Sequence, residues 1–286
     1  MKTINTITQD MKKTVFSFGF WACVVLTFVL CFTSVAYTDF DTGKQYSAFE
    51  AAFTLDMDFM KKHHEFFWYT VFSGCIGQYL SMLLPIITAF PFIPNFCAER
   101  NSGLIRYTII RTGKLRYCFS KFITALICGG IAVLMGTLLF GGFCYIRFLK
   151  PDDFNELVAM GGVLPERFEI LTMSVRRNLL GTFLFGMISA VPAFLLSAFI
   201  KNRYIITCIP FMAMYMYSTV IQKIYADKNY DWDFYTKNFY LFHDSLLNYW
   251  NAGDYLYRLV IFNVSAVVIS FVVFCFAMCR KADVGQ

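Results

Sequence analysis

The sequence predicts an all-α integral membrane protein that crosses the bilayer six times as a single transmembrane domain, residues 1–286. Of the 286 residues, 58% are hydrophobic and only 15% are charged, whereas soluble chains are about 45–50% apolar and about 25% charged. A single soluble core of this size could not bury so much apolar surface, and disorder requires the opposite composition. The chain also holds long runs without charge, and a helix needs roughly 20 mostly apolar residues to cross a bilayer core.

Six runs of this kind occur along the chain, at residues 15–37, 67–93, 118–146, 179–200, 204–221 and 259–279. The first run is longer than the apolar region of a cleavable signal peptide, so we expect it to be retained as an anchor. Ahead of it, apolar residues recur at helical spacing beside two lysines, at Ile4, Ile7, Met11, Lys12 and Lys13. This pattern is typical of an amphipathic N-terminal helix in the inner headgroup layer; a frayed polar tail is the alternative.

The later spans carry further signals. Pro85, Pro91 and Pro94 predict a bend where the second span leaves the membrane. Small residues recur four apart in the third and fourth spans, a spacing that lets helices approach closely, either for internal packing or for a dimer seam. The segment 222–258, between the fifth and sixth spans, is rich in Trp and Tyr. It predicts interfacial or re-entrant helices at the outer leaflet, with an ordinary aromatic belt as the alternative.

The distribution of Lys and Arg orients the spans. With both termini in the cytoplasm, the inner segments 1–14, 94–121, 201–203 and 280–286 hold thirteen of the 25 cations and three of the 19 anions. These segments have roughly half the total length of the outer ones, and dense Lys and Arg mark the cytoplasmic side. We therefore expect both termini inside. The net charge of +6 is concentrated at that side, which removes nucleic acid as a reason for the basic balance.

The chain lacks the sequence motifs that several classes of function require. The chain holds no G-x-x-x-x-G-K-[ST] phosphate loop and no H-E-x-x-H zinc motif, and no G-x-S-x-G nucleophile elbow. Lys121 is the one charged residue within the six runs, whereas catalysis inside a membrane needs buried ionisable groups. His63 and His64 lie beside Glu65 without further metal ligands nearby in the sequence. We expect no catalytic residue, no cofactor and no metal site, and we interpret the ten cysteines as packing residues.

The inner loop at residues 94–117 carries the strongest local pattern. Leu104, Tyr107 and either Ile110 or Arg111 fall on successive helical turns, which predicts a short helix parallel to the membrane. A turn is expected after it, at Thr112 and Gly113. One interpretation is a basic loop that only fixes the topology. The other is a docking element for a cytoplasmic protein.

This loop resembles the inner loop of bacterial ABC transporter permeases of the type-two exporter class. The resemblance rests on the acidic, glycine, basic and tyrosine positions Glu99, Gly103, Arg106, Arg111, Tyr117 and Lys121. In that family an acidic residue followed by a glycine opens a short coupling helix. A basic turn and a Tyr-x-x-x-Lys start of the third span then follow. Residues 102–106 depart from the family, because many members have Gly-Thr-hydrophobic-Glu there and this chain has no second acidic residue.

The resemblance implies a permease subunit in a bacterial cell membrane that exports an amphipathic peptide, lipid or drug-like compound. Its implied partners are ABC ATPase subunits, which would hydrolyse the ATP, and a second permease subunit in a homo- or heterodimer within the lipid bilayer. The residues implied in ATPase coupling are Glu99, Arg100, Gly103, Arg106, Tyr107 and Arg111. The alternative hypothesis is a non-transporting membrane scaffold or sensor that recruits a cytoplasmic partner through the basic loop.

Overall fold

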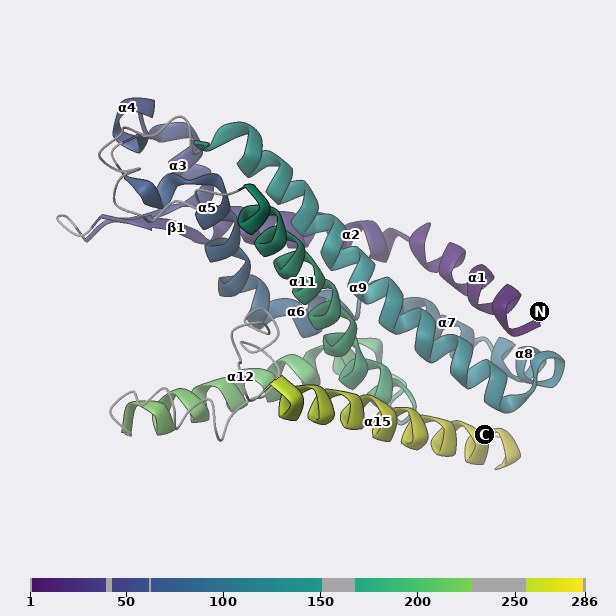
Figure 1. Ribbon diagram of the computed structural model, residues 1–286. Helices are drawn as coiled ribbons and strands as arrows, with labels where there is room; N and C mark the ends of the chain where they lie inside the picture. The colour runs from purple at the N-terminus through teal and green to yellow at the C-terminus, as the bar shows by residue number, and fades with distance from the viewer. Residues whose placement is uncertain (1, 40–42, 62, 151–167, 228–255, 285–286) are drawn as a thin grey trace.

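The computed structural model describes residues 2–39, 43–61, 63–150, 168–227 and 256–284. Its described part is mostly helical (Figure 1). The elements are α1 (Lys2–Val15), α2 (Phe18–Thr33), β1 (Val35–Thr38), β2 (Gln45–Ser47), α3 (Ala48–Thr54), α4 (Met57–Met60), a 3-10 turn (His64–Phe66), α5 (Trp68–Cys75), a π-helical turn (Ile76–Leu80), α6 (Ser81–Ile87), α7 (Ile93–Asn101), α8 (Leu104–Thr112), α9 (Lys114–Arg147), α11 (Phe168–Ser197), α12 (Arg203–Asp227) and α15 (Leu256–Val284). Most of the predicted interfacial segment 222–258 lies outside the described residues.

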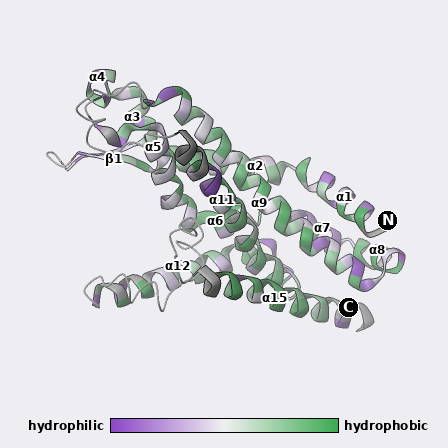
Figure 2. Cartoon of the chain, in the orientation of Figure 1, coloured by the Kyte–Doolittle hydropathy of each residue, from purple (hydrophilic) through white to green (hydrophobic). Residues whose placement is uncertain are grey.

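Five helical stretches are long and apolar enough to cross a membrane, and they overlap the second to sixth predicted spans. They are Trp68–Ile87, Lys114–Arg147, Ser174–Ser197, Arg203–Ile221 and Val260–Met278. The long helices are hydrophobic along most of their length (Figure 2). The described chain is therefore a mostly α-helical membrane protein.

The first predicted span, 15–37, differs from the expectation at both of its ends. Helix α2 has only 16 residues, about 24 Å at 1.5 Å per residue, and α1 is bent from it by 60°. The break occurs because Ser17 is extended and caps α2, its hydroxyl accepting a hydrogen bond from the Phe20 N–H. At the far end Ser34 is also extended, and the chain enters the antiparallel hairpin of β1 and β2. An all-α prediction omits this small hairpin.

The second span is interrupted in its middle. A π-helical turn joins α5 to α6, and Gln78 within it has non-helical angles, φ −88° and ψ −109°. The Gln78 side-chain amide makes two 2.8 Å hydrogen bonds to the backbone of Val35, donating to its carbonyl and accepting from its N–H. After α6 the chain turns at residues 88–92, and Pro94 lies in the first turn of α7. The proline-rich sequence predicted this last bend and gave no sign of the interruption.

Helix α9 is the central element of the fold. With 34 residues it is about 51 Å long, so it extends about 20 Å beyond a hydrocarbon core of about 30 Å. Small residues let its neighbours approach: a Cβ on Gly136 would lie 2.6 Å from the Thr27 Cβ of α2, and one on Gly129 would lie 3.2 Å from the Ala190 Cβ of α11. At these two positions the small-residue spacing therefore serves packing within the chain.

Candidate functional site

The inner loop that the sequence singled out lies at one end of the helix array. Helices α7 and α8 are found there together with the N-terminal helix α1, the first turns of α9 and the C-terminal end of α15 (Figure 1). We call this region the termini end. The hairpin of β1 and β2, with α3 and α4, lies at the opposite end of the molecule (Figure 1).

Two helices occupy the loop where the sequence predicted one. Helix α7 ends after Asn101, and Gly103 then adopts φ +73° and ψ 0° before α8 begins at Leu104. This left-handed conformation favours glycine, which has no Cβ to clash with the backbone. Glu99 and Arg100 therefore belong to α7, whereas Arg106, Tyr107 and Arg111 belong to α8. The turn predicted at Thr112 and Gly113 is confirmed, since α8 ends at Thr112.

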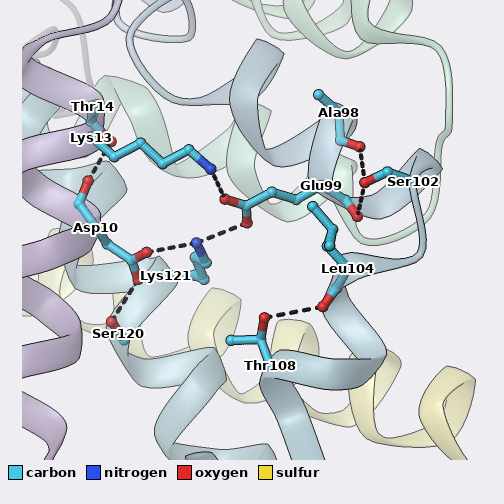
Figure 3. Close-up of polar contacts among 10 residues, drawn as sticks. All are labelled: Asp10, Lys13, Thr14, Ala98, Glu99, Ser102, Leu104, Thr108, Ser120 and Lys121. Carbon is cyan, nitrogen blue, oxygen red and sulfur yellow. Dashed lines mark hydrogen bonds and ion pairs between the residues drawn. The ribbon is translucent and has the colours of Figure 1, made fainter.

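Glu99 joins a network of charges that ties three helices together. The Lys121 ammonium of α9 lies 2.8 Å from Asp10 Oδ1 of α1 and 2.9 Å from Glu99 Oε2 of α7. The Lys13 ammonium of α1 lies 2.6 Å from Glu99 Oε1, and the Ser120 hydroxyl donates to Asp10 Oδ2 at 2.9 Å. Figure 3 shows these side chains converging from α1, α7 and α9. We call Asp10, Lys13, Glu99 and Lys121 the ion network.

The network neutralises a cation that is almost out of contact with solvent. The Lys121 side chain is only 6% exposed, and an unpaired buried charge is strongly destabilising. Two carboxylates balance two ammonium groups here. Burial by itself would raise the pKa of Glu99, but the ammonium groups of Lys121 and Lys13 outweigh it and hold this pKa below its ordinary value. Glu99 is therefore ionised at neutral pH and serves as an internal contact of the fold.

Arg100 makes a second link, from α7 to the end of α11. Its guanidinium donates from Nη1 to the carbonyl of Ser197 and from Nη2 to the carbonyl of Ile200. The last carbonyls of a helix have no partner within that helix, so the guanidinium satisfies groups that would otherwise lack one. Arg100, like Glu99, is directed into the protein.

Helix α8 presents a free face that is both apolar and basic. Ile105 and Ile109 are buried against the core, while Tyr107 is 76% exposed and Ile110 is 84% exposed. Arg111 is exposed on the same short helix. The Arg106 side chain lies outside the described part of the structure. We call the exposed residues Leu104, Tyr107, Ile110 and Arg111 the α8 face.

The six implied coupling residues thus separate into two groups with Gly103 between them. Glu99 and Arg100 position α7, and Tyr107 and Arg111 lie on the α8 face. The sequence did not reveal the ion pair of Lys121 with Asp10, because Asp10 lies 111 residues away from it. A usable signal was nevertheless present. A charge at the edge of a span needs a counter-charge, and the inner segments hold only three anions.

Within the described ranges, no group of three or more His, Cys, Asp or Glu residues is placed to hold a metal ion. The His63 ring packs among aromatic rings instead, 4.7 Å from Phe59 and 5.5 Å from Tyr37 between centroids. Of the nine cysteines whose side chains are described, eight are buried and Cys208 is exposed. The eight buried thiols agree with their interpretation as packing residues.

No protein-family model and no curated protein matches the chain. The function must therefore be inferred from the architecture of the spans and from the termini end.

Proposed function

We propose that the chain is the membrane-spanning permease subunit of an ATP-driven ABC exporter in a bacterial cell membrane, with both termini and the α8 face in the cytoplasm. A separate ATPase subunit docks on the α8 face and supplies the energy. The proposal rests on two neighbouring helices. Helix α8 exposes an apolar and basic face, and the charged side chains of α7 bind groups of three other helices, α1, α9 and α11.

The α8 face has the composition of a docking surface. Its exposed tyrosine and isoleucine offer apolar area, and Tyr and Arg are enriched where proteins bind one another. Ile105 and Ile109 on the opposite side of the helix hold it against the protein. A partner that pushes on α8 therefore moves a packed element rather than a loose loop.

Helix α7 passes such a movement on to the spans. Glu99 links it to α9 and α1 through Lys121 and Lys13, and Arg100 links it to the end of α11. Helix α7 also continues directly from the second span through the turn at 88–92. A displacement of α7 thus reaches the second, third and fourth spans and the N-terminal helix together.

The cargo and the assembly follow from the same proposal. The spans hold almost no charge, which suits an amphipathic cargo such as a peptide, a lipid or a drug-like compound. Export requires a second permease subunit, identical or related, so that a path can form between the two. No reaction is assigned to this chain itself, because ATP hydrolysis belongs to the partner.

Photo-cross-linking in intact cells of the native host tests the docking site. A photoreactive amino acid at Ile110 is expected to cross-link the chain to an ATP-binding subunit that mass spectrometry then identifies. The same residue placed at the exposed Lys44, at the opposite end of the molecule, is the matched control and is expected not to give this product. Cross-linking from Ile110 to a protein with no nucleotide-binding domain would instead support a scaffold or sensor, and a purely lipid adduct would contradict both.

A further inference from the structure

The short helix α3, at the end of the molecule opposite the termini, has three distinct faces. Ala48, Ala51 and Ala52 are fully buried against the protein. Phe49 and Phe53, one helical turn apart, are 55% and 61% exposed. The exposed polar residues Glu50 and Thr54 form the third face. This division into a protein side, an apolar side and a polar side is what a helix at a membrane surface requires.

Local hydrogen bonds hold α3 firmly in place. The Ser47 hydroxyl accepts from the Glu50 N–H at 3.2 Å, and the Glu50 carboxylate accepts from the Ser47 N–H at 3.1 Å. This reciprocal pair is a capping box, which fixes the first turn of a helix. The Ala48 N–H also donates to the Ser34 carbonyl, directly after α2. The orientation of the two phenylalanines is therefore set by the fold.

Ring contacts connect the apolar side of α3 to the spans. Phe49 lies 6.3 Å from Phe32 in the last turn of α2, and Phe53 lies 6.4 Å from Phe143 near the end of α9. Phe32 and Phe143 are themselves 4.5 Å apart. On α9, the exposed apolar residues Leu139 and Ile146 lie about one helical turn to either side of Phe143. The phenylalanines of α3 thus extend the apolar surface of the spans beyond their ends.

We propose that α3 lies in the bilayer leaflet on its own side of the membrane, with Phe49 and Phe53 inserted at the boundary between headgroups and acyl chains and with Glu50 and Thr54 in contact with water. The occupant of this surface is lipid, because the surface is continuous with α9, whose neighbouring side chains Leu139 and Ile146 are apolar and exposed. Aromatic rings are favoured at that depth. The inference is independent of the proposed function and holds for any activity of the spans.

The charges of α3 indicate whether it binds the bilayer through apolar insertion or through electrostatic attraction to headgroups. Helix α3 contains one acid, Glu50, and no base, so it has no cation of its own with which to attract anionic headgroups. The insertion is therefore apolar in origin. We expect it to be equally deep in zwitterionic and in anionic bilayers, and to be unaffected by salt.

Nitroxide accessibility in liposomes tests the depth directly. Single cysteines replace Phe49, Phe53, Thr54 or Lys44 in the full-length chain, in a background that carries Cys208→Ser and Cys279→Ser, and each is spin-labelled. Labels at Phe49 and Phe53 are expected to collide several-fold more with oxygen, which dissolves in the bilayer, than with a water-soluble nickel chelate. The matched label at Thr54, on the polar side of the same helix, is expected to shift toward the chelate, and the label at Lys44 to favour it strongly.

Two results would overturn the proposal. If the labels at Phe49 and Phe53 collided with the nickel chelate as often as the label at Lys44, α3 would lie in water. If they were shielded from both reagents, another protein or a second copy of the chain would cover the face. Two separate phenylalanine positions guard against one misfolded variant, and size-exclusion profiles check each protein. A depth that changed between phosphatidylcholine and phosphatidylglycerol vesicles would contradict the apolar origin of the contact.

Discussion

Aromatic rings pack at both ends of the helix array, and among the described residues the termini end adds a network of buried charges. At the termini end, charged side chains from α1, α7 and α9 meet in the ion network, and Arg100 binds the end of α11. At the opposite end, aromatic rings pack against one another. The ring centroid of Tyr37 in β1 lies 4.8 Å from that of Phe66, and the centroid of Phe32 in α2 lies 5.5 Å from that of Phe140 in α9. An ion network responds to pH because its carboxylates can be protonated.

The difference fits the roles proposed for the two ends. An ion network has discrete partners that can be exchanged, so a docked protein can shift it. A closely packed aromatic cluster resists rearrangement, because one ring cannot move unless its neighbours shift as well. The termini end is thus suited to receive a signal, and the opposite end is suited to anchor the spans in the bilayer.

The largest expected effect comes from removing the centre of the ion network. Lys121→Ala leaves the carboxylates of Asp10 and Glu99 without their shared cation, and breaking a buried pair in this way costs about 3–5 kcal/mol of unfolding free energy. Thermal unfolding of the purified protein in nanodiscs measures the loss. Lys44→Ala, at the exposed tip of the opposite end, is the control and is expected to change stability by less than about 1 kcal/mol. Equal effects of the two substitutions would remove the distinction between the ends.

A smaller effect is expected from the aromatic end. Phe66 is fully buried beside Tyr37, and Phe66→Leu keeps most of the side-chain volume while losing the ring contact. We expect a loss of about 1–2 kcal/mol. The loss is expected to be the same at low and at high salt. A marked salt dependence of Phe66→Leu, measured by the same unfolding assay, would show that charge also stabilises this end.

The smallest effect concerns pH. The pKa of Glu99 is lowered in the folded protein from its ordinary value of 4.5. Its contribution to stability is therefore fully present above about pH 4.5 and is lost as the pH falls through the lower folded pKa. Comparison of the wild type with Glu99→Gln by thermal unfolding is expected to give a difference at pH 7 that shrinks below pH 4.5. A stability difference that stayed constant with pH would show that Glu99 stabilises the fold through something other than its charge.

The sequence predicted the spans because a bilayer leaves few alternatives. A run of about 20 apolar residues has to be helical when no water is present to bind its backbone, and five of the predicted runs are indeed helical. Features that depend on contacts between distant residues were not predictable in the same way. The hydrogen bonds of Gln78 to Val35 and of Arg100 to the end of α11 follow no periodic pattern.

The coupling residues illustrate the same limit within a single loop. From the sequence, Glu99 and Arg111 were expected to belong to one helix. In the structure, the left-handed backbone of Gly103 separates them into α7 and α8. The glycine could have indicated this break, since glycine after a helix commonly ends it. The direction of each side chain could not be derived, because it depends on α1 and α11 from other parts of the chain.

The central claim is that an ATP-binding subunit docks on the α8 face, and purification from the native host tests it most directly. The account predicts that the tagged wild-type chain, extracted in mild detergent, carries an ATP-binding subunit in stoichiometric amount. It also predicts that Tyr107→Glu with Ile110→Glu loses this subunit while the chain stays folded, and that Lys44→Glu retains it. A wild-type chain that purifies without any ATP-binding protein, or a double variant that keeps it in full, would contradict the account.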